Sequence, residues 1–538
     1  MTDETAQTTF DTLQTPLARE VARRRTFAII SHPDAGKTTL TEKLLLYAGA
    51  IELAGAVRGR KSQRHATSDW MEMERERGIS ISSTALEFEI DGHRLTLLDT
   101  PGHRDFSEDT YRTLFAVDSV VMVIDAAKGI EPQTRKLFEV CRTRDLPILT
   151  FVNKLDRPCR DPLELIDEIE QVLGIGAAPM NWPVGTGDRF AGVYDMRAHE
   201  LTLYDRVVGG ATRAPVTVAG PDDPALADEI GEQAHRDLLD VVEVIAGAGA
   251  TFDVEAYRAA RVTPVYFGSA LMNFGLEPFL RALVELAPSP RPRPSEQGAV
   301  DPASPYFSGF IFKIQANMNP RHRDRIAFLR VCSGELSKDM PVVNARTGET
   351  VRLSRPHRFF GRERETVEVA YAGDVVGLVN PGKFAIGDTL HNGVPVRYPP
   401  VPRFAAEHFA TLRLDGTRHK QFDEGVRQLE EEGLMQVVFP LGGRREPILG
   451  VVGALQFDVI TARLSAEYGV TCAAVPLQYS AARWVVREGE PRRLKLPPGG
   501  VLEAVDRRER PVLLFESEWD LNYTSRENPD VQLLALHA

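Results

Sequence analysis

Cysteine is scarce in this sequence: the 538 residues contain four, at Cys141, Cys159, Cys332 and Cys472. They are widely separated, and their spacing fits neither a zinc site nor a small disulfide framework. A disulfide-stabilised secreted domain is therefore excluded. The sequence favours a reducing, intracellular compartment.

Long apolar runs are also missing. No stretch approaches the ~20 consecutive apolar residues that a membrane-spanning helix requires. The N-terminal string MTDETAQTTFDTLQTPLARE is polar and acidic, and it lacks the apolar core of an export signal. We therefore expect a cytoplasmic protein with no membrane partner.

Positive charge is in the minority, and the formal net charge is −12. This balance argues against non-specific nucleic-acid binding, and DNA is not an expected partner. Basic side chains nevertheless gather at 58–64, 321–325 and 352–364. These clusters either contact RNA phosphates or form solvated loops with ion pairs, because acidic residues are interleaved with the arginines. For Arg444 and Arg445 the sequence leaves RNA and protein surfaces equally open.

Short apolar runs alternate with helical patterns over residues 21–287. The runs at 27–30, 95–98, 120–124, 148–152 and 264–267 are nearly continuous, and several are rich in β-branched residues. This composition is typical of strands that are buried on both faces. The sequence therefore predicts an α/β domain with a mainly parallel sheet.

Proline clusters and changes of pattern divide the rest of the chain. Residues 288–305 hold prolines at a density that indicates a stiff linker rather than helix or sheet. Short, closely spaced strands then predict a small all-β barrel, and mixed strands and helices predict an α+β domain after it. The expected parts are a disordered or short N-terminal segment (1–20), a P-loop domain (21–287) with an insertion at about 183–260, the linker (288–305), the barrel (306–395) and the α+β domain (403–538).

The string SHPDAGKTT follows the first predicted strand and has the form of a phosphate-binding loop. Such loops point backbone N–H groups at a phosphate, and the next helix adds its positive end. Gly36 must be small, Lys37 reaches the β- and γ-phosphates, and the hydroxyl of Thr38 ligates Mg²⁺. Ser31 replaces the usual opening glycine, which only starts the turn. The residues of this loop that we predict to contact the nucleotide are Ser31, His32, Pro33, Asp34, Ala35, Gly36, Lys37, Thr38 and Thr39.

The string DTPGH comes directly after the predicted strand at 95–98. A carboxylate at a strand end, here Asp99, can hold Mg²⁺ through water, and Gly102 offers its N–H to a γ-phosphate. Asp99 alone could equally be a helix cap, but the whole string in register with the phosphate loop favours a nucleotide site. The predicted contacts are Asp99, Thr100, Pro101, Gly102 and His103.

The string NKLD indicates which base is bound. The carboxylate of Asp156 can accept from N1–H and the N2 amine of guanine, whereas adenine has an acceptor at N1 and no N2 amine. The stem of Lys154 can pack over the base, and small residues after the next strand let a backbone N–H approach guanine O6. We therefore predict GTP or GDP as the ligand. The predicted base-side contacts are Asn153, Lys154, Leu155, Asp156, Ser269 and Ala270.

These strings, in this order and each after a strand, resemble those of the translational GTPases, the elongation-factor family that acts on the ribosome. The resemblance extends to MERERGISIS at 73–82, VMVIDAAKGIE at 121–131 and KIQANMNPRHRDRIAFLR at 313–330, so it covers nearly the whole chain. In that family an RGITI-type segment is the first switch, and its hydroxyl binds Mg²⁺. The resemblance gives this role to Ser80, where serine replaces threonine and keeps the hydroxyl.

The resemblance implies a GTPase that needs Mg²⁺ and converts GTP to GDP on the ribosome. Thr38 and Ser80 would ligate the metal, and Asp99 would act through water. His103 would orient the attacking water, and we expect its ring to point away until the ribosome is contacted. The members that act in termination are the most similar. Their partners are the ribosome (RNA and proteins) and the stop-codon-reading release factors, which such a GTPase drives off the ribosome.

The alternative function is that of another ribosome-bound GTPase, either translocase-like or a ribosome-rescue factor. A translocase has a long tip domain, and elongation factor Tu has two barrels after its GTPase domain. This sequence instead has one barrel and one α+β domain, so termination is favoured. An ATPase is disfavoured by NKLD. The protein is expected to be a monomer.

Overall fold

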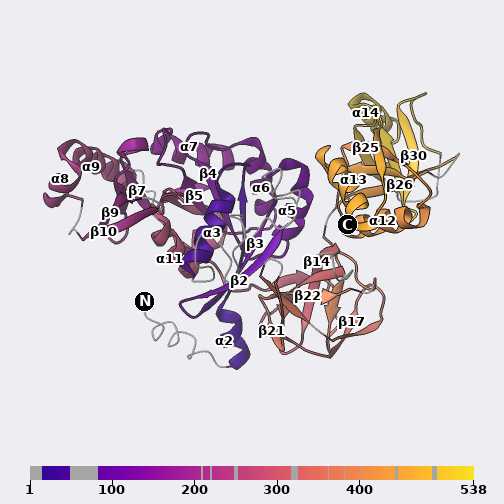
Figure 1. The fold of residues 1–538 in the computed structure, drawn as a ribbon, viewed down its shortest axis with the longest axis horizontal. Helices are drawn as coiled ribbons and strands as arrows, with labels where there is room; N and C mark the ends of the chain where they lie inside the picture. Colours follow the sequence, from indigo (N-terminus) through magenta and orange to yellow (C-terminus); the bar gives the residue numbers. More distant parts are fainter. Residues whose placement is uncertain are drawn as a thin grey trace.

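The computed structural model of this chain contains three domains that follow one another in the sequence (Figure 1). It describes residues 15–48, 83–207, 210–217, 221–247, 252–316, 325–354, 356–360, 363–380, 382–401, 403–442, 446–487 and 493–537. Ser80, the basic segment 58–64, Arg444 and Arg445 lie outside these ranges, as do residues 321–324. Within them, no helix is long and apolar enough to cross a bilayer.

A seven-stranded sheet, counted over the described residues, forms the centre of the N-terminal domain in the order β2-β3-β1-β4-β5-β11-β6. All neighbours are parallel except β2, which pairs antiparallel with β3. The strands are β1 (Arg24–Ser31), β2 (Thr84–Ile90), β3 (His93–Asp99), β4 (Ser119–Asp125), β5 (Ile148–Asn153), β6 (Gly176–Pro179) and β11 (Val262–Phe267). The predicted α/β domain with a mainly parallel sheet is thus confirmed.

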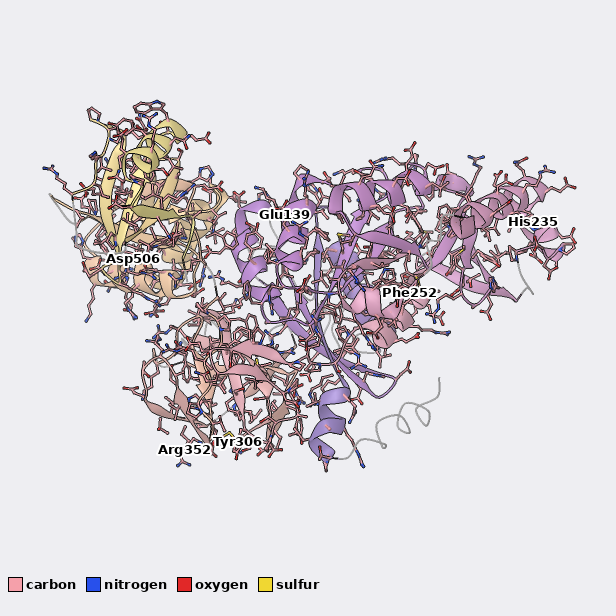
Figure 2. All side chains as sticks on the ribbon, turned by 180° about the vertical axis from the view of Figure 1, so that it is seen from behind. Glu139, His235, Phe252, Tyr306, Arg352 and Asp506 are labelled. Carbon is pink, nitrogen blue, oxygen red and sulfur yellow. The ribbon has the colours of Figure 1, made fainter. Side chains whose placement is uncertain are left out.

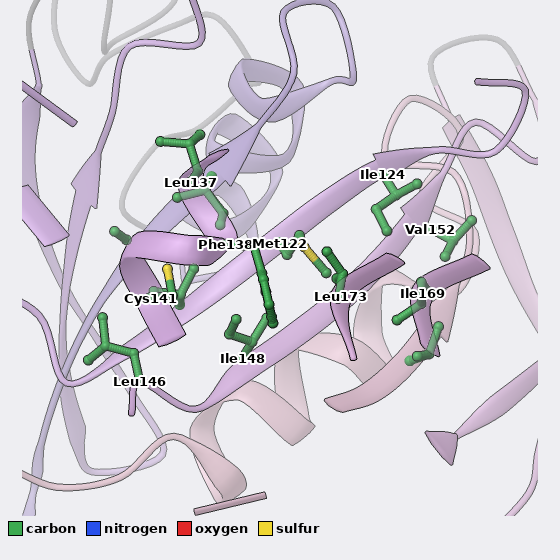
Figure 3. Close-up of a cluster of buried hydrophobic side chains, with 14 of the residues drawn as sticks. Met122, Ile124, Leu137, Phe138, Cys141, Leu146, Ile148, Val152, Ile169 and Leu173 are labelled. Carbon is green, nitrogen blue, oxygen red and sulfur yellow. The ribbon is translucent and has the colours of Figure 1, made fainter. Parts of the chain in front are cut away.

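Helices cover both faces of this sheet. They are α3 (Lys37–Tyr47), η1 (Arg104–Phe106), α5 (Ser107–Leu114), α6 (Pro132–Arg142), α7 (Pro162–Leu173) and α11 (Leu276–Leu286). Met122 and Ile124 of β4 pack in the cluster beneath α6 and α7 (Figure 3), while Val121 and Val123 pack in a second cluster with α3 and α11. Because alternate side chains of β4 are buried on opposite faces, the strand is apolar without interruption from Val120 to Ile124.

The insertion between β6 and β11 lies at the end of the molecule opposite the C-terminal domain (Figures 1 and 2). A four-stranded antiparallel sheet, in the order β10-β9-β8-β7, and helices make up its described part. The elements are β7 (Asn181–Val184), η2 (Gly187–Arg189), β8 (Gly192–Asp195), β9 (Glu200–Val207), β10 (Gly210–Thr217), α8 (Ala225–Ile230), α9 (Glu232–Gly247) and α10 (Val254–Arg258).

Two expected segments without regular structure need correction. Helix α2 (Pro16–Ala22) occupies part of the expected N-terminal segment 1–20, because Thr15 caps it and Pro16 starts its first turn. The predicted linker 288–305 contains a short antiparallel hairpin of β12 (Arg293–Ser295) and β13 (Gly298–Val300). Two-strand ribbons are tolerant of proline because each strand has a free edge.

The second domain is a barrel-like arrangement of short strands, as predicted. Its described residues form a sheet in the order β18-β17-β23-β14-β15-β22-β19-β20 and a small pair, β16 with β21. The strands are β14 (Ser308–Ala316), β15 (Arg325–Ser333), β16 (Glu335–Ser337), β17 (Met340–Asn344), β18 (Thr350–Leu353), β19 (His357–Phe360), β20 (Glu363–Thr366), β21 (Val369–Tyr371), β22 (Val375–Val379) and β23 (Thr389–His391).

The C-terminal domain is α+β, also as predicted. An eight-stranded sheet, within the described ranges, has the order β28-β25-β27-β26-β30-β31-β29-β32. The elements are β24 (Arg403–Phe404), β25 (His408–Leu414), α12 (His419–Glu431), β26 (Gln436–Pro440), β27 (Ile448–Val451), α13 (Leu455–Tyr468), β28 (Cys472–Pro476), β29 (Ala481–Arg487), β30 (Val501–Asp506), β31 (Pro511–Phe515), α14 (Glu518–Glu527), β32 (Val531–Leu534) and β33 (Leu536–His537).

Buried ion pairs join the N-terminal domain to the barrel. They are Arg24–Asp374, Arg330–Asp118 and Lys313–Asp109. Burial by itself raises the pKa of Asp374, but the guanidinium of Arg24, with its Nε 2.7 Å from Oδ1, outweighs this effect and lowers the pKa. The carboxylate therefore stays ionised at neutral pH, and removing Arg24 would leave the buried charge of Asp374 without its ion-pair partner.

Some arginines of the predicted basic clusters also form contacts within the chain. Arg325 pairs with Glu431 of α12, and Nε of Arg358 lies 3.0 Å from Oε2 of Glu87 in β2. For Arg325 and Arg358 the structure thus favours the ion-pair alternative. Both pairs join different domains, so the charges contribute to the arrangement of the domains.

Candidate active site

A cavity of about 350 Å³ opens where β1, β3, β5 and β11 end. Ligands of open parallel sheets bind at this edge, because the loops after the strands meet there. The cavity is lined by Ser31, His32, Pro33, Asp34, Gly36, Lys37, Thr38, Thr39, Gly102, His103, Asn153, Lys154, Asp156, Arg157 and Leu271. The structure therefore brings together predicted residues from the phosphate loop, DTPGH and NKLD, and the segment after β11 contributes Leu271.

The phosphate loop between β1 and α3 has the backbone shape that its sequence suggests. Asp34 has φ 66° and Gly36 has φ 99°, both in the left-handed region. A Cβ on Gly36 would lie only 2.2 Å from Nδ2 of Asn153, so the position accepts no side chain. Gly36 is also the N-cap of α3, and no side chain caps this helix end. The end of α3 is thus suited to an anion.

We expect Gly36→Ala to lower the affinity for GDP by at least about 100-fold. The added Cβ would clash with Asn153, and the backbone of an alanine would be strained in the left-handed conformation of this position. Titration with a fluorescent GDP analogue measures the loss. Gly416→Ala is the matched control, because Gly416 has φ +108° and a Cβ added there would meet no heavy atom within 4 Å. Equal affinities of the two variants would contradict the prediction.

Lys37 forms a buried ion pair with Asp99, and its Nζ lies 2.7 Å from Oδ1. Gly102 approaches the phosphate loop closely, since a Cβ on it would lie 3.7 Å from Cα of Pro33 and 4.0 Å from Cε of Lys37. The ammonium, the carboxylate and the loop after β3 therefore meet at one side of the cavity. This side carries the groups that phosphates and a cation require.

His103 lines the cavity, but its ring is bonded within its own loop. The N–H of Asp105 donates to Nδ1 of His103 over 3.2 Å, and Oδ1 of Asp105 lies 3.5 Å from the same nitrogen. The side chain of His103 is 31% exposed. The ring therefore remains accessible from the cavity while Nδ1 is held by Asp105.

Asn153 holds the loops around the base side together. Its Nδ2 donates to the carbonyl of Ala35 over 2.8 Å, and its Oδ1 accepts from the N–H groups of Lys154 and Ala270 at 2.8 and 2.9 Å. The N–H of Ser269 donates to the carbonyl of Phe274. The backbone N–H groups of the predicted base-side residues Ser269 and Ala270 are thus both bonded within the protein.

Lys154 lies across the base side in a left-handed conformation, with φ 72°, and its Nζ donates to Asp125 over 2.8 Å. Burial by itself raises the pKa of Asp125, but the hydrogen bonds from Lys154 and from the N–H of Ala127 outweigh burial and lower the pKa. This fixed contact orients the stem of Lys154 along the cavity wall.

Asp156 has a carboxylate that is only partly satisfied. Its Oδ1 is buried and has no hydrogen-bond partner in the structure, and its Oδ2 lies 3.9 Å from Nε of Arg157. A buried carboxylate oxygen without a donor is costly, so it marks a position where a ligand donor fits. This observation separates Asp156 from an ordinary surface carboxylate.

Several predicted contacts are not among the residues that line the cavity. They are Ala35, Asp99, Thr100, Pro101, Leu155, Ser269 and Ala270. The hydroxyl of Thr100 donates to the carbonyl of Ile29, and the N–H of Leu155 donates to the carbonyl of Gly268, so both residues hold the loops in place. Arg157 and Leu271 line the cavity but were not predicted, although each directly follows a predicted contact.

A magnesium site cannot be built from clustered acidic side chains, because the described part of the chain has no group of three or more His, Cys, Asp or Glu that could hold a metal. Thr38 lines the cavity, and Asp99 is held by Lys37 beside it. Magnesium bound with nucleotides takes most of its ligands from phosphates and water, so such a sparse set of protein ligands is compatible with it.

Comparison with known protein families divides the chain in the same way as the structure. Residues 22–289 match the Elongation factor Tu GTP binding domain, and residues 306–393 match Elongation factor G domain 2. Residues 398–525 match the Class II release factor RF3, C-terminal domain. The nucleotide predicted from NKLD is thereby confirmed as a guanine nucleotide.

Curated relatives match over nearly their whole length. Peptide chain release factor 3 of Synechocystis sp. is 54% identical over 97% of this chain and 96% of its own. The protein of the same name from Symbiobacterium thermophilum is 53% identical over 95% of this chain and 97% of its own. This chain belongs to the peptide chain release factor 3 family. As a member of that family, it is a GTPase of translation termination that recycles class I release factors.

The resemblance to translational GTPases and the termination function predicted for this release factor 3 family member are therefore confirmed. A crystal structure of a protein from Thermus thermophilus matches with a TM-score of 0.68 at 24% identity, over 90% of this chain and 73% of that one. At this identity the likeness shows the fold alone. It agrees with the three-domain architecture of Figure 1.

Proposed function

We propose that this release factor binds GTP in the cavity at the ends of β1, β3, β5 and β11, and that contact with the ribosome starts hydrolysis. The observation that carries the proposal is the buried, unpartnered Oδ1 of Asp156, opposite a phosphate loop in the same cavity. The N1–H and N2 amine of guanine supply the donors that this carboxylate lacks. Leu271, which is 54% exposed, offers an apolar surface for the base.

The phosphates bind at the loop between β1 and α3. There Lys37 leaves Asp99 for the β- and γ-phosphates, and the N–H of Gly102 bonds the γ-phosphate. Mg²⁺, when bound, neutralises charge that develops on the phosphates during transfer. The residues that would hold it are Thr38 and Ser80, through their hydroxyls, and Asp99, through water.

His103 orients the water that attacks the γ-phosphate. Because Nδ1 accepts from the N–H of Asp105, a neutral ring carries its proton on Nε2, and Nε2 can donate to water or phosphate. The side chain must turn to reach the γ-phosphate, and the ribosome supplies the contact that turns it. Hydrolysis then removes the γ-phosphate that the N–H of Gly102 bonds, and the loop after β3 is released.

The proposed setting of this reaction is supported by the family membership. The protein acts as a monomer in the cytoplasm, and its partners are the ribosome and the stop-codon-reading release factors. The functional parts are the GTP-binding domain (21–287), the barrel (306–395) and the C-terminal domain (403–538). The barrel clusters at 321–325 and 352–364, apart from the paired Arg325 and Arg358, contact ribosomal RNA phosphates.

GTP turnover tests this proposal under three conditions: the protein alone, with ribosomes, and with ribosomes that carry a stop-codon-reading factor. We expect ribosomes to raise turnover by at least about 100-fold, in line with the stimulation that positioning groups provide in phosphoryl transfer. The bound factor should also leave the ribosome faster. Equal turnover with and without ribosomes would refute the ribosome-dependent step.

A further inference from the structure

The loop that contains His103 is also a contact surface for the C-terminal domain. Asp105 and Phe106 of η1 and Arg112 of α5 all touch that domain, which lies beside α5 and α6 in Figure 1. Phe106 packs against Val459 of α13, and both side chains are almost fully buried. The segment that carries the catalytic histidine is therefore held from outside the GTPase domain.

Helix α13 takes its N-terminal cap from this loop. The N–H of Leu455, the first residue of α13, donates to Oδ2 of Asp105 over 2.8 Å, across a sequence separation of 350 residues. The residue at the N-cap position is Ala454, which offers no side-chain acceptor. The carboxylate of Asp105, which is 7% exposed, supplies the missing cap and interacts favourably with the positive helix end. We call this contact the Asp105 cap.

The fit around the Asp105 cap leaves no space. A Cβ on Gly453 would lie 2.2 Å from Cγ and 2.4 Å from Cα of Asp105. The backbone of the C-terminal domain thus touches both the side chain and the main chain of Asp105. Arg112 adds a second contact of the same kind, since its Nη2 donates to the carbonyl of Gly433 over 3.2 Å.

Asp105 also holds His103. Its N–H donates to Nδ1 of His103 over 3.2 Å, so one residue bonds the catalytic ring with its main chain and α13 with its side chain. The ring cannot turn toward the γ-phosphate while Nδ1 keeps this bond. As long as α13 is docked, the position of the Asp105 N–H is fixed, and the orientation of His103 is fixed with it.

We propose that Asp105 is a positioning residue through which the docked C-terminal domain restrains His103 and suppresses GTP hydrolysis away from the ribosome. This inference rests on the role of His103 proposed above. Undocking of α13 removes the Asp105 cap, frees the loop and lets the ring turn. The position of the C-terminal domain thereby controls a residue in the nucleotide site.

Gly453→Ala tests the restraint in the full-length protein, because its methyl group would push Asp105 from α13. We expect hydrolysis of GTP without ribosomes to rise by at least about fivefold, the lower end of ordinary couplings between sites. Gly499→Ala is the matched control, since it adds a methyl group to the same domain with nothing within 4 Å, and it should leave the rate unchanged.

The tautomer of His103 is a readout that a purely structural role would not change. With ¹³C- and ¹⁵N-labelled histidine, the ring of His103, assigned by its absence in His103→Gln, should report the Nε2–H form in the unaltered protein. We expect a mixture of tautomers in Gly453→Ala. Asp105→Ala should behave like Gly453→Ala, whereas Asp105→Asn keeps an oxygen acceptor for the N–H of Leu455 and should restore nearly normal rate and tautomer.

Two results would overturn the inference. The first is an unchanged rate and tautomer in both Gly453→Ala and Asp105→Ala. The second is a rise in rate that persists when Gly453→Ala is combined with His103→Ala, because the effect would then bypass the histidine. A failure of the proposed function would give a different result. In that case the His103→Ala variant by itself would still hydrolyse GTP at the ribosome-stimulated rate.

Discussion

Asp156→Asn is expected to lower the affinity for GTP by about 10⁴-fold, because a site built to pair with a donor rejects a ligand that leaves its polar groups unpaired. The asparagine amide would face the N2 amine of guanine, donor against donor. Xanthosine triphosphate carries a carbonyl oxygen at that position, so it should bind the variant better than GTP does. Competition against a fluorescent GDP analogue measures both affinities.

Asp167→Asn is the control for this substitution. Asp167 lies on the exposed face of α7, so the change removes the same charge away from the cavity. GTP affinity should then be unaltered. Failure of Asp156→Asn to prefer xanthosine triphosphate over GTP would show that the buried Oδ1 of Asp156 does not read the base.

His103→Ala is expected to lower the rate of GTP hydrolysis on ribosomes by at least about 100-fold, the usual contribution of a positioned group that handles a proton or water. The affinity for GDP should change little, because the base and the phosphate loop are untouched. Single-turnover hydrolysis with saturating ribosomes measures the chemical step, and the fluorescent GDP titration measures binding.

His408→Ala serves as the control, since His408 is an exposed histidine of β25 in the C-terminal domain. Its rate on ribosomes should equal that of the unaltered protein. Should His103→Ala also hydrolyse GTP at the unaltered rate, another residue must orient the water. The same result would remove the basis of the restraint through Asp105.

The local motifs could be read from the sequence because their chemistry is tied to short stretches of backbone. Gly36 must be glycine where φ is 99°, and the strand that precedes it places the loop at the end of the sheet. β4 is apolar at alternate positions on both faces, which predicts a buried central strand before any contact is known. Each of these features depends only on residues that lie close to it in the sequence.

The partners of the motif residues could not be read in the same way. Asn153 is predicted as a nucleotide contact and lines the cavity, but the sequence did not show that its side chain also joins the phosphate loop to the loop after β11. Thr100 is predicted as a nucleotide contact, and the sequence did not show that its hydroxyl donates to the carbonyl of Ile29 in β1. Each of these hydrogen bonds depends on which loops lie side by side. The order of the strands in the sheet decides which loops are neighbours.

The sequence by itself determined the nucleotide, the reaction and the succession of an α/β domain, a barrel and an α+β domain. Its motifs are short, and the geometry of one strand and one loop fixes what each can bind. Only the tertiary structure decided that Asp105 bonds both His103 and Leu455, and that Arg358 pairs with Glu87. The contacts of Asp105 with Leu455 and of Arg358 with Glu87 join residues hundreds of positions apart, and their existence depends on how whole domains pack rather than on any local preference of the chain.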